Sequence, residues 1–206
     1  RSSDLAGFRR VDATTITPPY FTLSEDRSAQ RISIDRAGAL LSNAYLAAEQ
    51  AKARALGGLP VHTFRDGDKG REKAKNHALT KLVARRWNPL MTAQTGWQWV
   101  SVRRDTFGGA YVRVVWHAGE PVEFWPINVP VETFYDATAP VSPVRYSVQP
   151  GDKFTPAGNY FPNEILYFPT CISTDGGVTG RSLAELAAAE IGLDINLTRF
   201  YSSIIA

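Results

Sequence analysis

The sequence predicts an α+β domain that ends in a long amphipathic helix. Apolar residues recur at helical spacing over residues 35–56 and again over residues 183–204. Between them, residues 110–168 form short alternating runs separated by glycine and proline, which is typical of strands. With 206 residues and 44% hydrophobic content, the chain can bury a core, so a disordered protein is excluded.

The first part of the chain is predicted to be an irregular arm followed by a helix. Residues 1–34 contain two adjacent prolines and no sustained hydrophobic period. Apolar residues over residues 35–56 keep helical spacing, and Gly57-Gly58 followed by Pro60 is a stop signal. We therefore expect one long helix that ends near Leu56.

A strand and two further helices are predicted next. Residues 61–65 alternate apolar and polar side chains and lead into an Asp-Gly-Asp turn. Leu79, Leu82 and Val83 make the apolar stripe of a second helix that Asn88-Pro89 ends. Thr92 can cap a third helix, which runs to about Arg104 before a Gly-Gly pair.

Short strands make up the following region. The β-rich pattern predicts Ala110–Trp116, Val122–Pro126, Val131–Tyr135, Val144–Val148 and Glu164–Phe168.

The last helix is the most informative element of the sequence. Seven positions at alternating spacings of three and four form a seam, and six of them are apolar: Leu183, Leu186, Glu190, Leu193, Leu197, Phe200 and Ile204. A second stripe comprises Ala184, Ala187, Ala188, Ile191 and Ile195. A helix of about 25 residues is about 37 Å long, which exceeds what a small domain needs for its own core. We expect much of it to pack on something outside the chain, most simply another copy.

No catalytic or cofactor-binding pattern is present. The glycine-rich segment at 176–182 has three residues between Gly176 and Gly180, followed by Arg181, whereas a phosphate-binding P-loop needs four residues and then lysine. Ser182 and Glu185 instead predict a capping box at the start of the last helix.

The histidines and the single cysteine also lack partners in the sequence. His62, His77 and His117 lie in unrelated contexts, and no cysteine–histidine spacing predicts a metal site. Cys171 ends an apolar strand and is interpreted as a buried, inert thiol in a protein of a reducing compartment. We predict neither enzyme activity nor a cofactor.

Charge is distributed unevenly along the chain. Residues 1–104 carry 18 Lys+Arg against 9 Asp+Glu, which gives +9, and residues 105–206 carry 5 against 11, which gives −6. Such asymmetry fits nucleic-acid contact or head-to-tail self-association. A basic patch lies within residues 65–86, and its candidates for phosphate contact are Lys69, Arg71, Lys73, Lys75, Arg85 and Arg86. A solvated surface explains this patch better, because no aromatic residues alternate with the charges.

Several short motifs occur in a specific order. They are Leu59–Phe64, His77-Ala78-Leu79 leading to Asn88–Thr92, Gly108–Tyr111, Trp125-Pro126-Ile127, Glu164–Phe168, Asp175–Leu183, Ala189–Leu193 and Arg199-Phe200-Tyr201. In this order, over residues 35–201, they resemble the portal (head-to-tail connector) family of tailed double-stranded-DNA bacteriophages, in its siphophage-type branch.

The resemblance implies a structural role. Portal proteins form a homo-oligomeric ring, usually of twelve subunits, at one capsid vertex of the virion, and they are assembled in the host cytoplasm. Double-stranded DNA passes through the channel of the ring. The protein partners of the ring are the capsid proteins, the terminase, which docks during packaging, and the head-tail adaptor proteins, which bind afterwards. No membrane is involved, in line with the absence of any apolar run of about 18 residues.

The resemblance also assigns regions of the chain. Residues 1–34 would be the arm, 35–180 a wing-like α/β domain, and 181–206 the start of a stem-like helix, while the clip, remaining wing and crown are absent. Candidates for the subunit interface or channel are Leu186, Glu190, Leu193, Leu197, Arg199 and Phe200, with Arg199 expected at the lumen or a subunit seam.

Two alternatives remain open at the level of sequence. One is a nucleic-acid-processing enzyme whose basic patch over residues 65–86 tracks phosphates. The other is a monomeric adaptor or scaffold protein whose last helix folds back on its own domain.

Overall fold

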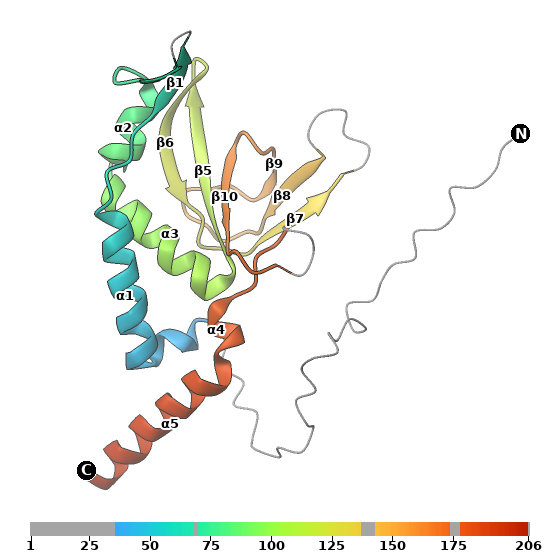
Figure 1. Cartoon of the computed structure of the whole chain (residues 1–206). Helices are drawn as coiled ribbons and strands as arrows, with labels where there is room; N and C mark the ends of the chain where they lie inside the picture. The colour runs from blue at the N-terminus through green and yellow to red at the C-terminus, as the bar shows by residue number, and fades with distance from the viewer. Residues whose placement is uncertain (1–35, 68–69, 137–142, 174–177, 206) are drawn as a thin grey trace, which may run out of the picture. The chain divides into compact units, whose positions relative to one another are not determined.

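A three-stranded antiparallel sheet forms the centre of the domain, and helices cover one of its faces (Figure 1). The computed structural model describes residues 36–67, 70–136, 143–173 and 178–205. The sheet has the order β10-β5-β6, with β5 at Gly109–His117, β6 at Glu120–Pro126 and β10 at Ile165–Pro169. The predicted arm over residues 1–34 lies outside the described residues.

A second antiparallel sheet has the order β7-β8-β9. Its strands are β7 (Val131–Tyr135), β8 (Val144–Val148) and β9 (Gly158–Tyr160). Tyr111 of β5 joins the two sheets, because its ring meets that of Tyr146 of β8 edge-on with centroids 5.9 Å apart and its hydroxyl lies 3.1 Å from Thr133 Oγ1 of β7. Burial raises the pKa of Tyr111, so the phenol stays neutral within this second core.

The helical layer begins with a 3₁₀ turn, η1 (Gly38–Leu41), and helix α1 (Asn43–Gly57). Helix α2 (Ala78–Ala84) packs on β6, and α3 (Ala93–Phe107) packs on both α1 and β5. Two small hairpins complete the layer: β1 (Phe64–Gly67) with β2 (Gly70–Lys73), and β3 (Arg86–Asn88) with β4 (Met91–Thr92).

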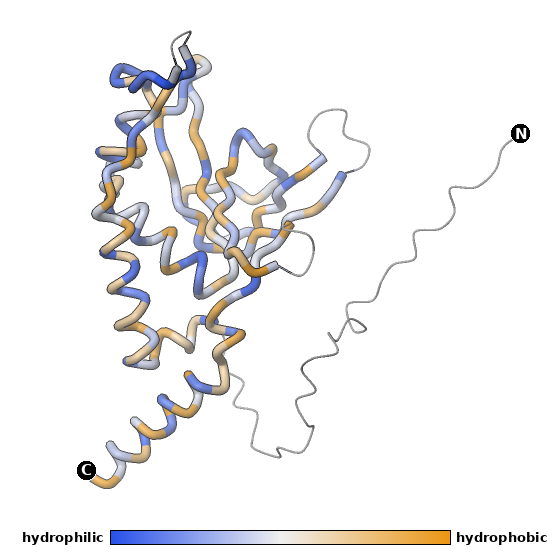
Figure 2. Tube along the Cα trace, viewed as in Figure 1, coloured by the Kyte–Doolittle hydropathy of each residue, from blue (hydrophilic) through white to orange (hydrophobic). Residues whose placement is uncertain are grey.

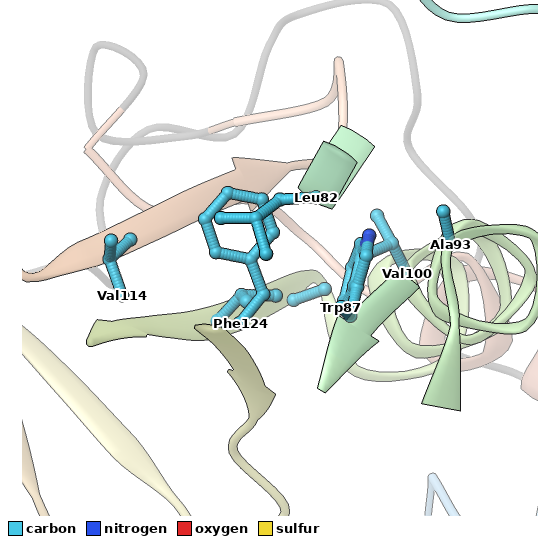
Figure 3. Close-up of a cluster of buried hydrophobic side chains, with 8 residues drawn as sticks. Leu82, Trp87, Ala93, Val100, Val114 and Phe124 are labelled. Atoms are coloured by element: carbon cyan, nitrogen blue, oxygen red, sulfur yellow. The ribbon is translucent and has the colours of Figure 1, made fainter. Parts of the chain in front are cut away.

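Trp87 is the centre of the main core, between α2, α3 and the sheet (Figure 3). Its ring meets those of Trp97 and Phe124 edge-on, with centroids 5.3 and 5.7 Å away. Gly96 of α3 lies against the same indole, so a Cβ there would be 2.3 Å from Trp87 Cδ2. The indole of Trp87 therefore has room only because residue 96 is glycine, and their close contact holds α3 against the core.

Backbone contact between Gly108 and Gly180 sets where the chain leaves the sheet for the last helices. Gly108 ends α3 in the left-handed region with φ 89°, and a Cβ there would lie 2.3 Å from Gly180 O. A Cβ on Gly180 would lie 2.1 Å from Gly108 O. Thr170 N donates to Gly108 O at 3.1 Å, and Thr170 Oγ1 donates to Arg181 O at 2.8 Å. Glycine is required at both positions because two backbones touch.

Many predicted elements are confirmed. The strands β5, β6, β7, β8 and β10 occur within two residues of the predicted bounds, and Val131–Tyr135 and Val144–Val148 match fully. Thr92 caps α3, since its Oγ1 accepts a hydrogen bond from Thr95 N at 3.1 Å.

Three helix and strand bounds were wrong. The first predicted helix is interrupted at Ser42, whose side chain caps α1 and separates it from η1. The second helix ends at Ala84 rather than at Asn88, because Arg86–Asn88 pairs with β4. The predicted strand at 61–65 shifts to Phe64–Gly67, where it gains β2 as a partner.

Within the described part of the chain, no helix combines the length and the hydrophobicity that crossing a lipid bilayer requires.

Gly108→Ala is expected to destabilise the domain far more than Gly119→Ala. Both glycines have positive φ, but a Cβ on Gly119 would meet nothing within 4 Å. The backbone penalty alone costs about 1–2 kcal/mol, and the clash with Gly180 adds about 1–3 kcal/mol at position 108. Denaturant unfolding measures both variants, and equal losses of unfolding free energy would contradict the proposed close contact.

Candidate subunit interface

Helix α5 (Ala188–Ile205) projects from the domain (Figure 1). The exposed fractions of its large apolar side chains are high: Leu193 61%, Leu197 45%, Phe200 59%, Tyr201 61% and Ile204 64%. Every residue from 196 to 204 is exposed. Figure 2 shows hydrophobic and hydrophilic residues interleaved along the whole helix, so the apolar face continues beyond its contact with the domain.

The opposite stripe of this segment packs on its own chain. Ala184 and Ile191 are 2% and 5% exposed and form a small cluster with Ala39. Partly buried Tyr45, Ala187 and Ile195 surround it. The two predicted stripes therefore differ in their surroundings: the alanine–isoleucine stripe contacts the domain, whereas the seam is exposed from Leu186 onward.

The last helix is not continuous, in contrast to the prediction. It consists of α4 (Leu183–Leu186) and α5, and Ala187 between them has φ −98° and ψ 18°. Ser182 caps α4 as predicted: its Oγ accepts from Glu185 N at 3.1 Å and donates to Thr106 O at 2.5 Å. The Glu185 carboxylate, which a capping box would direct to the Ser182 amide, accepts instead from Arg36 Nη2 at 3.3 Å.

A single hydrogen bond ties α5 to the start of α1. Ser42 Oγ donates to Asp194 Oδ2 at 2.5 Å and accepts from Tyr45 N at 3.2 Å. Ser42 is only 2% exposed. One serine therefore serves as the N-cap of α1 and as a contact for α5.

An ion-pair network holds α1 to α3. Lys52 Nζ lies 2.8 Å from Glu49 Oε1 and also contacts Asp105, whose other oxygen pairs with Arg104 Nε at 2.9 Å. Glu49 and Asp105 are 4% and 2% exposed. Burial lowers the pKa of Lys52, but hydrogen bonds to Asp105 and Glu49 outweigh burial and raise the pKa above its ordinary value. The lysine is thus charged and compensates two buried carboxylates.

The remaining interface candidates are exposed. Leu186, at 46% exposure, belongs to α4, and Glu190 and Arg199 lie in solvent on α5. Within the described ranges, neither Glu190 nor Arg199 has an ion-pair partner. The structure thus brings all six candidates to one projecting segment, and their role in an interface or channel remains a prediction.

The basic patch is divided between two elements. Arg71 and Lys73 lie on the fully exposed strand β2, and Arg71 pairs with Asp66 at 3.6 Å. Arg85 follows α2, and Arg86 of β3 donates from Nε to Asn88 O at 3.0 Å. Lys75 lies exposed between the two elements, and Lys69 is outside the described residues. Phosphate contact by these residues remains a prediction.

Cys171 is exposed, so its interpretation as a buried thiol was wrong. It lies two residues past the end of β10, where the chain turns away from the sheet. His77 caps α2 through Nδ1, which accepts from Leu79 N at 3.2 Å. Among the residues with described positions, no group of three histidine, cysteine or acidic side chains could hold a metal ion.

Sequence reasoning missed two features of the domain. The contact of Ser42 with Asp194 joins residues 152 positions apart, so local spacing carries no signal for it. An apolar groove of about 600 Å³ between α2 and the β5–β6 hairpin was also missed; its lining includes Trp97, Trp116, Phe124 and Phe168.

Comparisons with known proteins give three results. A family model described as "Phage portal protein" matches residues 43–206. A solved structure described as "Neck of empty GTA particle computed with C6 symmetry" has a TM-score of 0.65 and 16% sequence identity. That match covers 85% of this chain and 46% of the other, so this chain spans less than half of its structural neighbour. No curated protein matches.

The comparisons confirm the predicted fold class. The chain has a mixed helix and strand fold, and that fold is similar to the fold of a chain from the neck of the GTA particle. At 16% identity, the likeness to that chain shows the fold alone.

Lys52→Met is expected to lower the free energy of unfolding by about 1–3 kcal/mol at pH 7, because it removes the ion pair of buried Glu49 and leaves buried Asp105 with Arg104 alone. The lysine side chain is 41% exposed, so solvent screening keeps the loss below that of a fully buried pair. Lys81→Met on exposed α2 is the matched control. Because the folded-state pKa is raised above the ordinary value of 10.5, the difference from the parent protein should be fully present at neutral pH and should decline only as the pH rises through the higher folded-state pKa. A loss that persists unchanged at alkaline pH would contradict this origin.

Proposed function

The chain belongs to the phage portal protein family, and on this premise we propose that it is a structural, non-enzymatic subunit of a ring through which double-stranded DNA enters and leaves a capsid. The family match extends over residues 43–206, so it includes both the domain and α5.

The exposed apolar face of α5 is the observation that carries the proposal. Large apolar patches on a single subunit usually mark an interaction site. The outer part of α5 has no tertiary contact within the described residues, and isolated helices of this length are marginal in water. A neighbour that covers Leu193, Leu197 and Phe200 would stabilise the helix.

Another copy of the chain is the simplest neighbour. The halves of the chain carry charges of +9 and −6, so different faces of two copies would attract each other. Contacts between different faces are head-to-tail, and such contacts close into a ring when the rotation between successive copies is an integral fraction of a full turn. A ring of twelve is compatible with the C6 symmetry of the neck particle.

The regions of the chain follow from this assignment. Residues 35–180 form a wing-like domain, and residues 181–206 begin a stem that leads towards the channel. Arg199 lies at the lumen or at a seam between subunits. The partners are terminase, capsid and head-tail adaptor proteins together with the DNA, and the protein resides in the virion after assembly in the host cytoplasm.

Two measurements separate this function from the alternatives. A nuclease assay with divalent metal should show no activity, whereas a nucleic-acid-processing enzyme would cleave DNA. Light scattering should give the mass of a multimer, whereas an adaptor or scaffold protein would remain monomeric.

Leu193→Lys combined with Leu197→Lys is expected to abolish ring formation, because burying two unpaired ammonium groups costs several kcal/mol per subunit. Asn196→Lys combined with Ser203→Lys is the matched control, since it adds the same charge at two exposed positions outside the seam. Mass and electron microscopy distinguish rings from monomers. Rings formed equally well by both variants would exclude the seam from the interface.

Arg199→Ala tests the position of that side chain. We expect fewer rings or reduced DNA packaging, because a cation is lost from the lumen or a seam. The control is Ser203→Ala, which removes an exposed polar group from the same helix. Unchanged assembly and packaging in Arg199→Ala would place Arg199 elsewhere.

A further inference from the structure

The direction of α5 depends on very few contacts. Ala184, Ile191 and Gly192 are the buried residues of α4 and α5, and Ala187 and Ile195 are partly buried beside them. Along the backbone, Ala187 interrupts the helix, so α4 and α5 do not form one rigid helix. A helix of 18 residues is about 27 Å long, so a small rotation at its base moves its end by several ångströms.

Ser42 and Asp194 supply the polar contact at this base. The bond of 2.5 Å between Ser42 Oγ and Asp194 Oδ2 joins a hydroxyl to a carboxylate, a strong class of hydrogen bond. Ser42 is 2% exposed, so water competes weakly for it. Asp194 also lies at the N-terminus of α1, where unpaired amides and the helix dipole favour a negative charge.

The partners of Ser42 fix its orientation. Tyr45 N donates to Ser42 Oγ at 3.2 Å, which positions the hydroxyl at the first turn of α1. Helix α1 is in turn held to α3 by the Lys52 network. The hydroxyl that meets Asp194 is therefore attached to the rigid part of the domain.

We propose that Asp194 is a positioning residue that sets the angle at which α5 leaves the domain and thereby the angle at which its seam meets the next subunit. The part concerning the next subunit rests on the proposed function. A head-to-tail contact closes a ring only when the rotation between copies is fixed. A variable α5 angle would give rings of mixed size or open chains.

Electron spin resonance measures the angle directly. Because Cys171 is the sole cysteine of the chain, Cys171→Ser gives a background in which Ala47→Cys on α1 and Ser203→Cys on α5 carry spin labels. Both positions are exposed. Dilution with unlabelled protein leaves one labelled copy per assembly. We expect a narrow distance distribution in this parent and a broader or shifted one after Asp194→Ala, while Asn196→Ala leaves it unchanged.

Two further variants separate positioning from general damage. Asp194→Asn keeps an acceptor oxygen for Ser42 and should restore most of the narrow distribution. Ser42→Ala should broaden the distribution alone but add nothing in the Asp194→Ala background, because both changes break the same bond. A distribution in Asp194→Ala that superimposes on the parent distribution overturns the proposal.

Electron microscopy of the same variants tests the consequence for assembly. Rings of Asp194→Ala should vary in subunit number or be fewer than in the parent, and Asp194→Asn should resemble the parent. Uniform parental rings from Asp194→Ala, despite an altered distance distribution, overturn the assembly role. If the parent forms no rings, the proposed function fails, while the spin-label distances still decide whether Asp194 fixes α5.

Discussion

A helix that exposes leucine and phenylalanine along one side is stable in water only beside a partner, and this constraint organises the protein. Helix α5 meets its own domain through small side chains around Ile191 and leaves its large apolar residues uncovered. The domain itself is well packed around Trp87. The uncovered apolar surface is therefore confined to α5 and does not reflect a poorly packed domain. The proposal that the protein is a ring subunit depends on this surface.

The domain supplies a rigid base for that helix. The sheet β10-β5-β6 carries α3, and the glycine contact between residues 108 and 180 brings the end of β10 to the end of α3. From there Ser182 caps α4 and binds Thr106 O, so the last segment starts at a fixed point. Three contacts therefore set the direction of the last segment: the close approach of Gly108 and Gly180, the cap at Ser182, and the hydrogen bond of Asp194 with Ser42. They leave the apolar seam of α5 exposed.

Local patterns in the sequence predicted most of this fold. Alternation located β5 to β8, and helical spacing identified α1, α3 and the seam of α5, because these signals depend on neighbours within a few residues. The break at Ser42 and the pairing of Ser42 with Asp194 involve residues far apart in sequence, so periodicity could not reveal them. Cys171 was misplaced because an apolar strand precedes it, although the chain turns into solvent directly afterwards. The six interface candidates fell on one segment because the seam itself is local.

Electron cryo-microscopy of the assembled protein tests the central claim most directly, through the solvent exposure of Leu193, Leu197 and Phe200 in each subunit. We predict that a neighbouring copy covers these three side chains in a closed ring. Side chains that remain in solvent in the assembly, or that fold back onto their own domain, would contradict the account.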